Sequence, residues 1–132
     1  MSKVCRLLPI GPTIPSFYLG KHLENDNDYG LNLFILDSSI CNNWLNTKPT
    51  GFVIYASFGS MASLSNKQME ELAFALIGSK FHFLWVVKAS EEAKLLEKFV
   101  EEIGNKGLVV QWCSQLEVLS NKEIGCFLTH CG

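Results

Sequence analysis

Four short apolar runs, separated by more polar segments, constrain the fold of this chain more than any other feature. They are rich in β-branched and aromatic residues and occupy residues 52–58, 81–87, 108–110 and 125–129. Such nearly continuous runs are typical of strands that are buried on both faces, as in a parallel sheet. Parallel strands need crossover connections, so we predict an α/β domain: a Rossmann-like parallel sheet with flanking helices.

Helix signals lie between these runs. Ser65 and Gln68 have the spacing of a capping box, which predicts a helix that ends at Gly78 and buries Met69, Leu72, Ala73 and Leu76. Ser114 and Glu117 have the same spacing and predict a second, short helix. Further helices are expected at 37–45 and at 91–103, the latter closed by Gly104, with its Glu and Lys side chains on a solvated face.

The first 37 residues differ from the rest of the chain. Pro9, Pro12 and Pro15 leave no room for a long helix or a central strand, and residues 24–28 are a polar run typical of a loop. We therefore expect residues 1–37 to be a connector that follows another domain, and residues 38–132 to belong to the α/β domain.

Composition and charge exclude several classes of function. With 48% apolar and 18% charged residues, the chain can build a packed core and is not expected to be disordered. Eleven Lys and Arg against 13 Asp and Glu give a net charge of −2, which argues against nucleic acid or an anionic membrane surface as a partner. The apolar runs are well under the ~20 residues of a membrane span. The five cysteines are odd in number and lie in or beside apolar runs, which favours a reduced, cytoplasmic protein.

Candidate ligand-binding residues follow the apolar runs, because ligands of open parallel sheets bind beyond the carboxyl ends of the strands. Gly59 and Ser60 offer flexible backbone and a hydroxyl to a phosphate, and His130 offers an imidazole. The indole of Trp112 can stack on a base, for about 1–3 kcal/mol, and Gln115 can reach a ribose hydroxyl. From spacing alone, a plain turn at Gly59–Ser60 and a helix-start role for Gln115 are favoured over ligand binding. A packed aromatic ring and a structural histidine explain Trp112 and His130 as well as ligand binding does.

Other motifs that would carry chemistry are missing from the sequence. Cys126, His130 and Cys131 have a spacing that matches no usual zinc site, so we expect no metal. The chain contains no G-x-G-x-x-G, no P-loop and no G-x-S-x-G elbow. Dinucleotide oxidoreductases, P-loop kinases and α/β-hydrolases therefore lose support.

Two segments resemble the first half of the signature of plant secondary-product glycosyltransferases, residues 112–119 (WCSQLEVL) and 125–132 (GCFLTHCG). Upstream, residues 53–60 (VIYASFGS) and 83–87 (FLWVV) have the order and spacing found in plant UDP-glycosyltransferases. The resemblance implies a GT-B fold, in which the C-terminal of two Rossmann-like domains holds the UDP-sugar. Residues 1–37 would then be the end of the N-terminal domain and the interdomain linker. Residues 38–132 would be a partial C-terminal domain that stops within the signature.

The resemblance also implies which residues bind the UDP-sugar donor. Trp112 corresponds to the residue that stacks on uracil. Cys113 corresponds to one that pairs with the uracil edge through its backbone, so its side chain is expected to matter little. The remaining donor-binding positions are Gln115 near the ribose, Ser60 and His130 at the diphosphate, and Gly132.

The function implied is that of an inverting, UDP-glucose-dependent glucosyltransferase that uses no metal or further cofactor. Its acceptor would be a small plant secondary metabolite such as a flavonoid, phenolic or carboxylic acid. His22, His82 and His130 do not match the family's catalytic base, so no catalytic residue is assigned and the 132-residue chain alone is expected to be inactive. We further expect a cytoplasmic monomer.

Two other functional classes remain as alternatives. One is a non-catalytic nucleotide-binding or interaction module derived from the same family. The other is an unrelated flavodoxin-like regulatory domain, which needs an acidic cluster at the strand ends. Since those ends hold Ser, Trp and His, the flavodoxin-like alternative is the weaker one.

Overall fold

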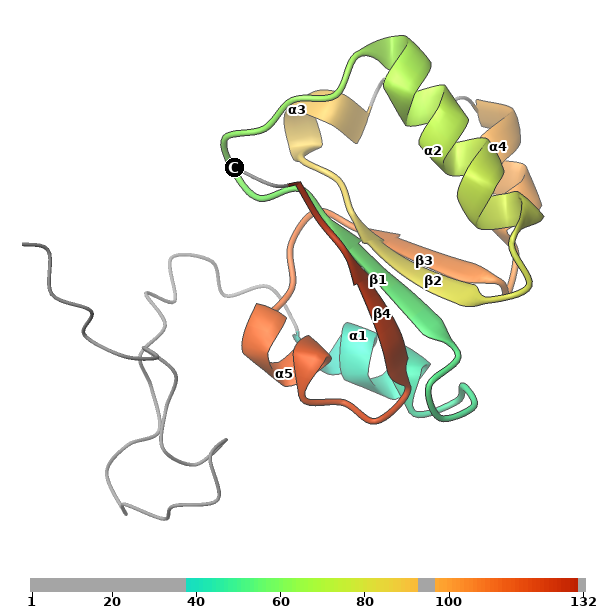
Figure 1. Ribbon diagram of the computed structural model, residues 1–132, viewed down its shortest axis with the longest axis vertical. Coiled ribbons are helices and arrows are strands. Elements are labelled where there is room, and N and C mark those ends of the chain that lie inside the picture. The colour runs from blue at the N-terminus through green and yellow to red at the C-terminus, as the bar shows by residue number, and fades with distance from the viewer. Residues whose placement is uncertain (1–37, 93–96, 131–132) are drawn as a thin grey trace, which may run out of the picture. The chain divides into compact units, whose positions relative to one another are not determined.

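The computed structural model describes residues 38–92 and 97–130. Helices and strands alternate along the chain in the order α1 (Ser38–Leu45), β1 (Val53–Ser57), α2 (Asn66–Gly78), β2 (His82–Val86), α3 (Ala89–Glu92), α4 (Glu97–Ile103), β3 (Gly107–Val110), α5 (Gln115–Leu119) and β4 (Ile124–Leu128). The four strands form one parallel sheet with the order β3-β2-β1-β4 (Figure 1). This confirms the predicted parallel sheet, and each strand lies within one residue of the run that predicted it.

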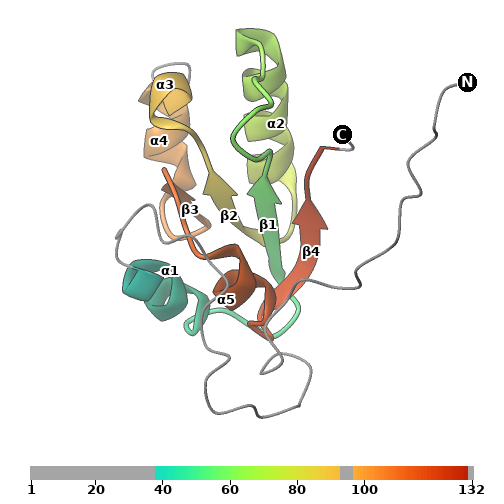
Figure 2. The same ribbon diagram turned by 90° about the vertical axis from the view of Figure 1, so that its left-hand side faces the viewer.

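Helices cover both faces of the sheet (Figure 2). α2, α3 and α4 lie over one face, and α1 and α5 lie over the other. Successive strand residues point to opposite faces, so Ala56 belongs to the core beneath α2 and α4, whereas Tyr55 belongs to the core beneath α1 and α5. Two apolar layers therefore hold the sheet, as expected for strands that are buried on both faces.

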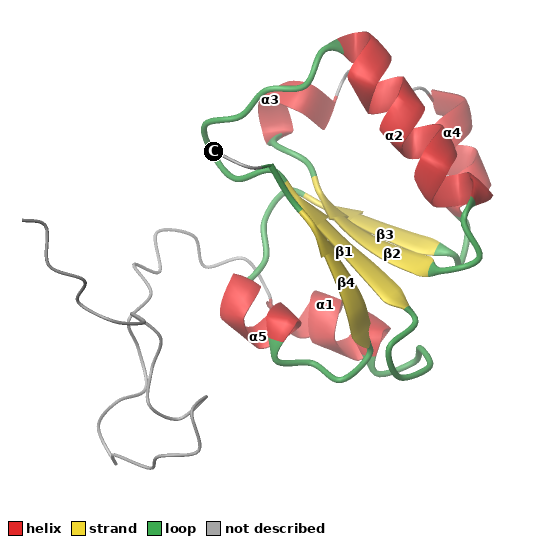
Figure 3. Ribbon diagram, viewed as in Figure 1, coloured by secondary structure: helices red, strands yellow, loops and turns green. Residues whose placement is uncertain are grey.

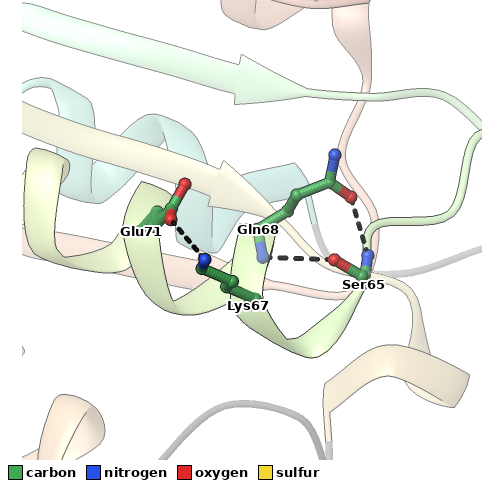
Figure 4. Close-up of polar contacts among 4 residues, drawn as sticks. All are labelled: Ser65, Lys67, Gln68 and Glu71. Atoms are coloured by element: carbon green, nitrogen blue, oxygen red, sulfur yellow. Dashed lines mark hydrogen bonds and ion pairs between the residues drawn. The ribbon is translucent and has the colours of Figure 1, made fainter.

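α2 begins and ends where the sequence predicts. Ser65 Oγ accepts a hydrogen bond from the backbone N–H of Gln68 at 3.3 Å, and Gln68 Oε1 accepts one from the N–H of Ser65 at 3.0 Å (Figure 4). The capping box is therefore formed in full. The helix buries Met69, Ala73 and Leu76, and Leu72 is half-buried.

Two helix predictions hold in part. α3 begins at Ala89, two residues before the predicted start, and α4 covers Glu97–Ile103 and ends where predicted; residues 93–96 lie outside the described residues. Phe99 and Ile103 are buried as predicted, and Gly104 adopts a φ of +46° after α4. Ser114 precedes α5 as its N-cap but makes no capping hydrogen bond through its side chain. The predicted box partner Glu117 instead accepts a hydrogen bond from Asn42 Nδ2 of α1, at 3.4 Å.

β4 lies where it is predicted but is less buried than the other strands. Gly125, Cys126 and Phe127 are exposed, so the expectation of a fourth fully buried strand is wrong for the part of the chain that the structure describes. The reason is the position of β4 at the end of the strand order, where β1 is its only neighbour among the described strands. Phe127 still stacks on Tyr55 of β1, with ring centroids 5.0 Å apart.

Several expectations fall on residues that the structure does not describe. The connector expected at 1–37, the inward-facing Leu95 and Leu96, and the donor-binding position Gly132 lie outside the described residues. Across residues 38–92 and 97–130, no helix has the length and apolar character needed to cross a membrane.

Candidate functional site

The carboxyl ends of all four strands lie along one edge of the sheet, since the strands run in the same direction (Figure 2). From β1 the chain proceeds outward to β2 and β3, and then returns to the other side of β1 to form β4. The strand order therefore reverses between β1 and β4. In open α/β sheets, ligands bind in the crevice at such a reversal. The loops that follow β1 and β4 leave the sheet together at this edge (Figure 3).

The two loops meet at Gly59 and His130. Gly59 has a φ of +68°, in the left-handed region that favours glycine. A Cβ placed on Gly59 would lie 3.4 Å from Cε1 of His130. Ser60 and His130 are both exposed. Two groups that were predicted from separate strand ends, a hydroxyl and an imidazole, thus lie on adjoining loops and face solvent.

Trp112 and Gln115 lie farther along the same edge. Trp112 is the second residue after β3, which is separated from β1 by β2, and its side chain is half-buried. Gln115 is the first residue of α5 and is exposed. The structure therefore places the indole at the carboxyl edge of the sheet, two strands from Gly59 and Ser60.

Cys113 is anchored in the core rather than exposed at this edge. Its side chain is only 4% exposed, and its Sγ lies 3.3 Å from the hydroxyl of Tyr55. The Cys113 thiol also hydrogen-bonds to the thiol of Cys41, which lowers the pKa of Cys113. The expectation that this side chain matters little is thus incomplete, because it ties the segment after β3 to β1 and to α1.

Sequence reasoning missed two residues near the site, Lys88 and Glu91. Glu91 was expected on a solvated helix face, but it is 7% exposed. Its Oε1 accepts hydrogen bonds from Ser63 Oγ at 2.6 Å and from the backbone N–H of Leu64 at 3.2 Å. Lys88 Nζ donates to the carbonyl oxygen of Ala62. Helical periodicity carries no signal for these contacts, because the partners lie more than 25 residues away in the loop after β1.

A parallel sheet whose strand order reverses in this way is typical of the nucleotide-binding class of α/β folds. Residues 28–132 match the sequence profile of the family described as UDP-glucoronosyl and UDP-glucosyl transferase, and the chain belongs to that family. It is 56% identical, over its whole length, to flavonol 7-O-beta-glucosyltransferase UGT74F1 of Arabidopsis thaliana. It is 59% identical, over 99% of its length, to UDP-glycosyltransferase 74F2 of the same plant. The chain spans 29% of the length of each of these relatives.

Solved structures of GT-B glycosyltransferases have the same fold. Os79 from O. sativa in complex with UDP superimposes with a TM-score of 0.83 and 41% sequence identity, over 93% of this chain and 27% of that chain. UGT2 of Phytolacca americana, complexed with UDP-2fluoro-glucose and pterostilbene, matches 74% of this chain and 23% of its own, with a TM-score of 0.66 and 44% identity. The fold of the described residues is therefore that of part of a GT-B enzyme.

Proposed function

We propose that this chain is the donor-binding part of an inverting, UDP-glucose-dependent glucosyltransferase. The observation that carries the proposal is the meeting of the Gly59–Ser60 loop with His130 at the reversal of strand order, in a chain that belongs to the UDP-glycosyltransferase family. We place its acceptor among small plant metabolites such as flavonoids, phenolics and carboxylic acids. The support is the likeness to a flavonol 7-O-glucosyltransferase.

The donor would lie along the carboxyl edge of the sheet. Uracil would stack on Trp112 and pair with the backbone of Cys113, which the core contacts of the Cys113 side chain hold in place. The left-handed turn at Gly59 lets the backbone approach a diphosphate closely. The other proposed contacts are Gln115 at the ribose, and Ser60, His130 and Gly132 at the diphosphate.

The reaction would transfer glucose with inversion at the anomeric carbon. A general base takes the proton from an acceptor hydroxyl or carboxyl, whose oxygen attacks the anomeric carbon while the bond to UDP breaks. Negative charge develops on the departing diphosphate, and hydrogen bonds from His130 and Ser60 stabilise it. The base would come from the N-terminal domain of the full-length enzyme. We place that enzyme in the cytoplasm, as a monomer.

Trp112→Ala in the full-length enzyme tests the donor site. Loss of base stacking, at about 1–3 kcal/mol, should raise the KM for UDP-glucose and the Kd for UDP by about tenfold or more. The KM for the acceptor should change less than twofold, and Trp112→Phe should restore most of the donor affinity. Steady-state kinetics with each substrate varied, together with calorimetric titration of UDP, measure these constants.

Three outcomes contradict the proposal. If Trp112→Ala raised the KM for UDP-glucose and the KM for the acceptor equally, the proposed stacking of uracil on Trp112 would be wrong. No UDP release from UDP-glucose with any member of a phenolic and flavonoid panel would argue against a transferase. UDP binding without release would favour the non-catalytic nucleotide-binding module instead.

A further inference from the structure

The loop after β1 is held by side chains that follow β2. The Glu91 carboxylate accepts hydrogen bonds from the Ser63 hydroxyl and the Leu64 N–H, and Lys88 donates to the Ala62 carbonyl. Three consecutive loop residues are thus tied to the segment after the neighbouring strand. Because β1 and β2 are hydrogen-bonded to one another along their length, these contacts fix the loop relative to the sheet.

Because Glu91 is buried, a loop conformation that broke its hydrogen bonds would be energetically unfavourable. The residue is 7% exposed and borders a small hollow that is also lined by Met69 and Trp85. A carboxylate in such surroundings is unfavourable unless it is hydrogen-bonded, and hydrogen bonds to a charged group are stronger than those between neutral groups. A loop conformation that withdrew Ser63 and Leu64 would leave the charge without these two donors.

The same contacts determine where Ser60 lies. The loop begins at the end of β1, makes its left-handed turn at Gly59, and is tied down again from Ala62 to Leu64. Ser60 and Met61 are left between the two fixed points, and Met61 is 92% exposed. The tip of the loop is therefore presented to solvent beside His130 without being packed itself.

We propose that Glu91 and Lys88 are positioning residues, which hold the loop at 59–64 in the shape that binds the diphosphate of the sugar donor. This inference rests on the proposed function, because it takes the Gly59–Ser60 turn as the diphosphate site. Neither side chain touches the donor. They act through Ser63, Leu64 and Ala62, and they fix the loop before the donor arrives, which reduces the ordering cost of binding.

Variants at Glu91 and Ser63 in the full-length enzyme test the inference. Glu91→Ala should raise the Kd for UDP and the KM for UDP-glucose about tenfold. Glu91→Gln keeps an oxygen acceptor for both donors and should give a smaller increase. Ser63→Ala removes one of the two bonds and should raise the Kd for UDP about threefold, with little further effect in the Glu91→Ala background. The acceptor KM should stay within twofold throughout.

A readout that does not depend on catalysis separates positioning from general stability. Hydrogen exchange at residues 59–64 should become faster in Glu91→Ala, while β1 and β2 keep their protection. Glu101→Ala, at an exposed position of α4, is the matched control and should change neither exchange nor donor affinity. If Glu91→Ala does not fold, Glu91→Gln and Ser63→Ala decide the question by the same measurements.

A lower melting temperature with an unchanged Kd for UDP would overturn the inference, since Glu91 would then be structural only. The same holds if all variants bind UDP as the unchanged enzyme does. If the unchanged enzyme itself fails to bind UDP, the proposed function fails and this inference fails with it. UDP binding by the unchanged enzyme therefore distinguishes the two failures.

Discussion

Cys41, Tyr55 and Cys113 form a buried group of hydrogen-bonding side chains beneath the segment that follows β3. The hydrogen bond with Cys113, together with burial, raises the pKa of the Cys41 thiol. Burial, together with the contact with Cys113, raises the pKa of the Tyr55 hydroxyl. Both groups therefore remain protonated near neutral pH, and Cys41 is not expected to be a reactive nucleophile.

Alkylation of the native protein tests this description of the thiols. A raised pKa favours the protonated thiol, so Cys41 should resist iodoacetamide from pH 7 to pH 9, whereas the exposed Cys126 should be modified at least tenfold faster. Peptide mapping by mass spectrometry resolves the individual cysteines. In urea, which unfolds the protein and exposes both thiols, Cys41 and Cys126 should be alkylated at similar rates; this is the control for the effect of burial. Equal rates in the native protein would contradict the buried thiol pair.

At the scale of the elements, β4 joins β1 through an irregular register. Val53 lies opposite Ile124, but the next pair is Ile54 and Cys126, so Gly125 has no residue opposite it in β1. A Cβ on Gly125 would lie 2.1 Å from the backbone oxygen of Gly51. Glycine is therefore required at position 125, because the backbone of Gly51 lies too close to leave room for a side chain and cannot move aside as a flexible side chain could.

Gly125→Ala should accordingly loosen the start of β4. We expect the free energy of unfolding to fall by about 1–3 kcal/mol, because the methyl group forces the two backbone segments apart. Urea denaturation followed by circular dichroism gives this quantity. Gly78→Ala is the matched control, since a Cβ at Gly78, the last residue of α2, meets no atom within 4 Å. It should be neutral or stabilising by up to about 1 kcal/mol. Equal losses in both variants would contradict the close contact at Gly125.

At the scale of the whole molecule, the sheet order brings the carboxyl ends of all four strands, and with them the candidate donor site, to one edge of the sheet. Three of the proposed donor contacts, Ser60, Trp112 and His130, lie at one edge of the sheet. His82 lies in β2, its ring nitrogen Nδ1 paired with the carbonyl of Lys106, so it is not a candidate base at that edge. The proposed reaction requires an acceptor pocket and a base from elsewhere in the enzyme.

The isolated 132-residue chain should therefore catalyse no glucosyl transfer. UDP release from UDP-glucose, measured with the phenolic panel, should not exceed the rate without protein, whereas the full-length enzyme should turn over. The control is the same chain added to the active full-length enzyme, where it should not inhibit the assay. Turnover by the isolated chain would show that the base lies within these 132 residues.

Much of the fold follows from the sequence because its signals are local. A buried strand needs a run of apolar β-formers, and a helix needs a periodic apolar face with a cap, each within about 15 residues. The run at 52–58 and the Ser65–Gln68 box are examples that the structure confirms. The positions of Ser60, Trp112 and His130 at strand ends follow as well, because the ends of parallel strands share one edge.

Only the tertiary structure decided which strand ends are neighbours and which polar side chains are buried. The strand order, the meeting of Gly59 with His130, and the contacts of Glu91 with the loop all join residues far apart in the sequence. Ser65 and Ser114 have the same capping signature, yet only Ser65 caps through its side chain, and the side chain of Glu117 meets Asn42 of α1 rather than the start of its own helix. Local patterns determine the elements, whereas contacts between elements depend on packing that no local window of the sequence contains.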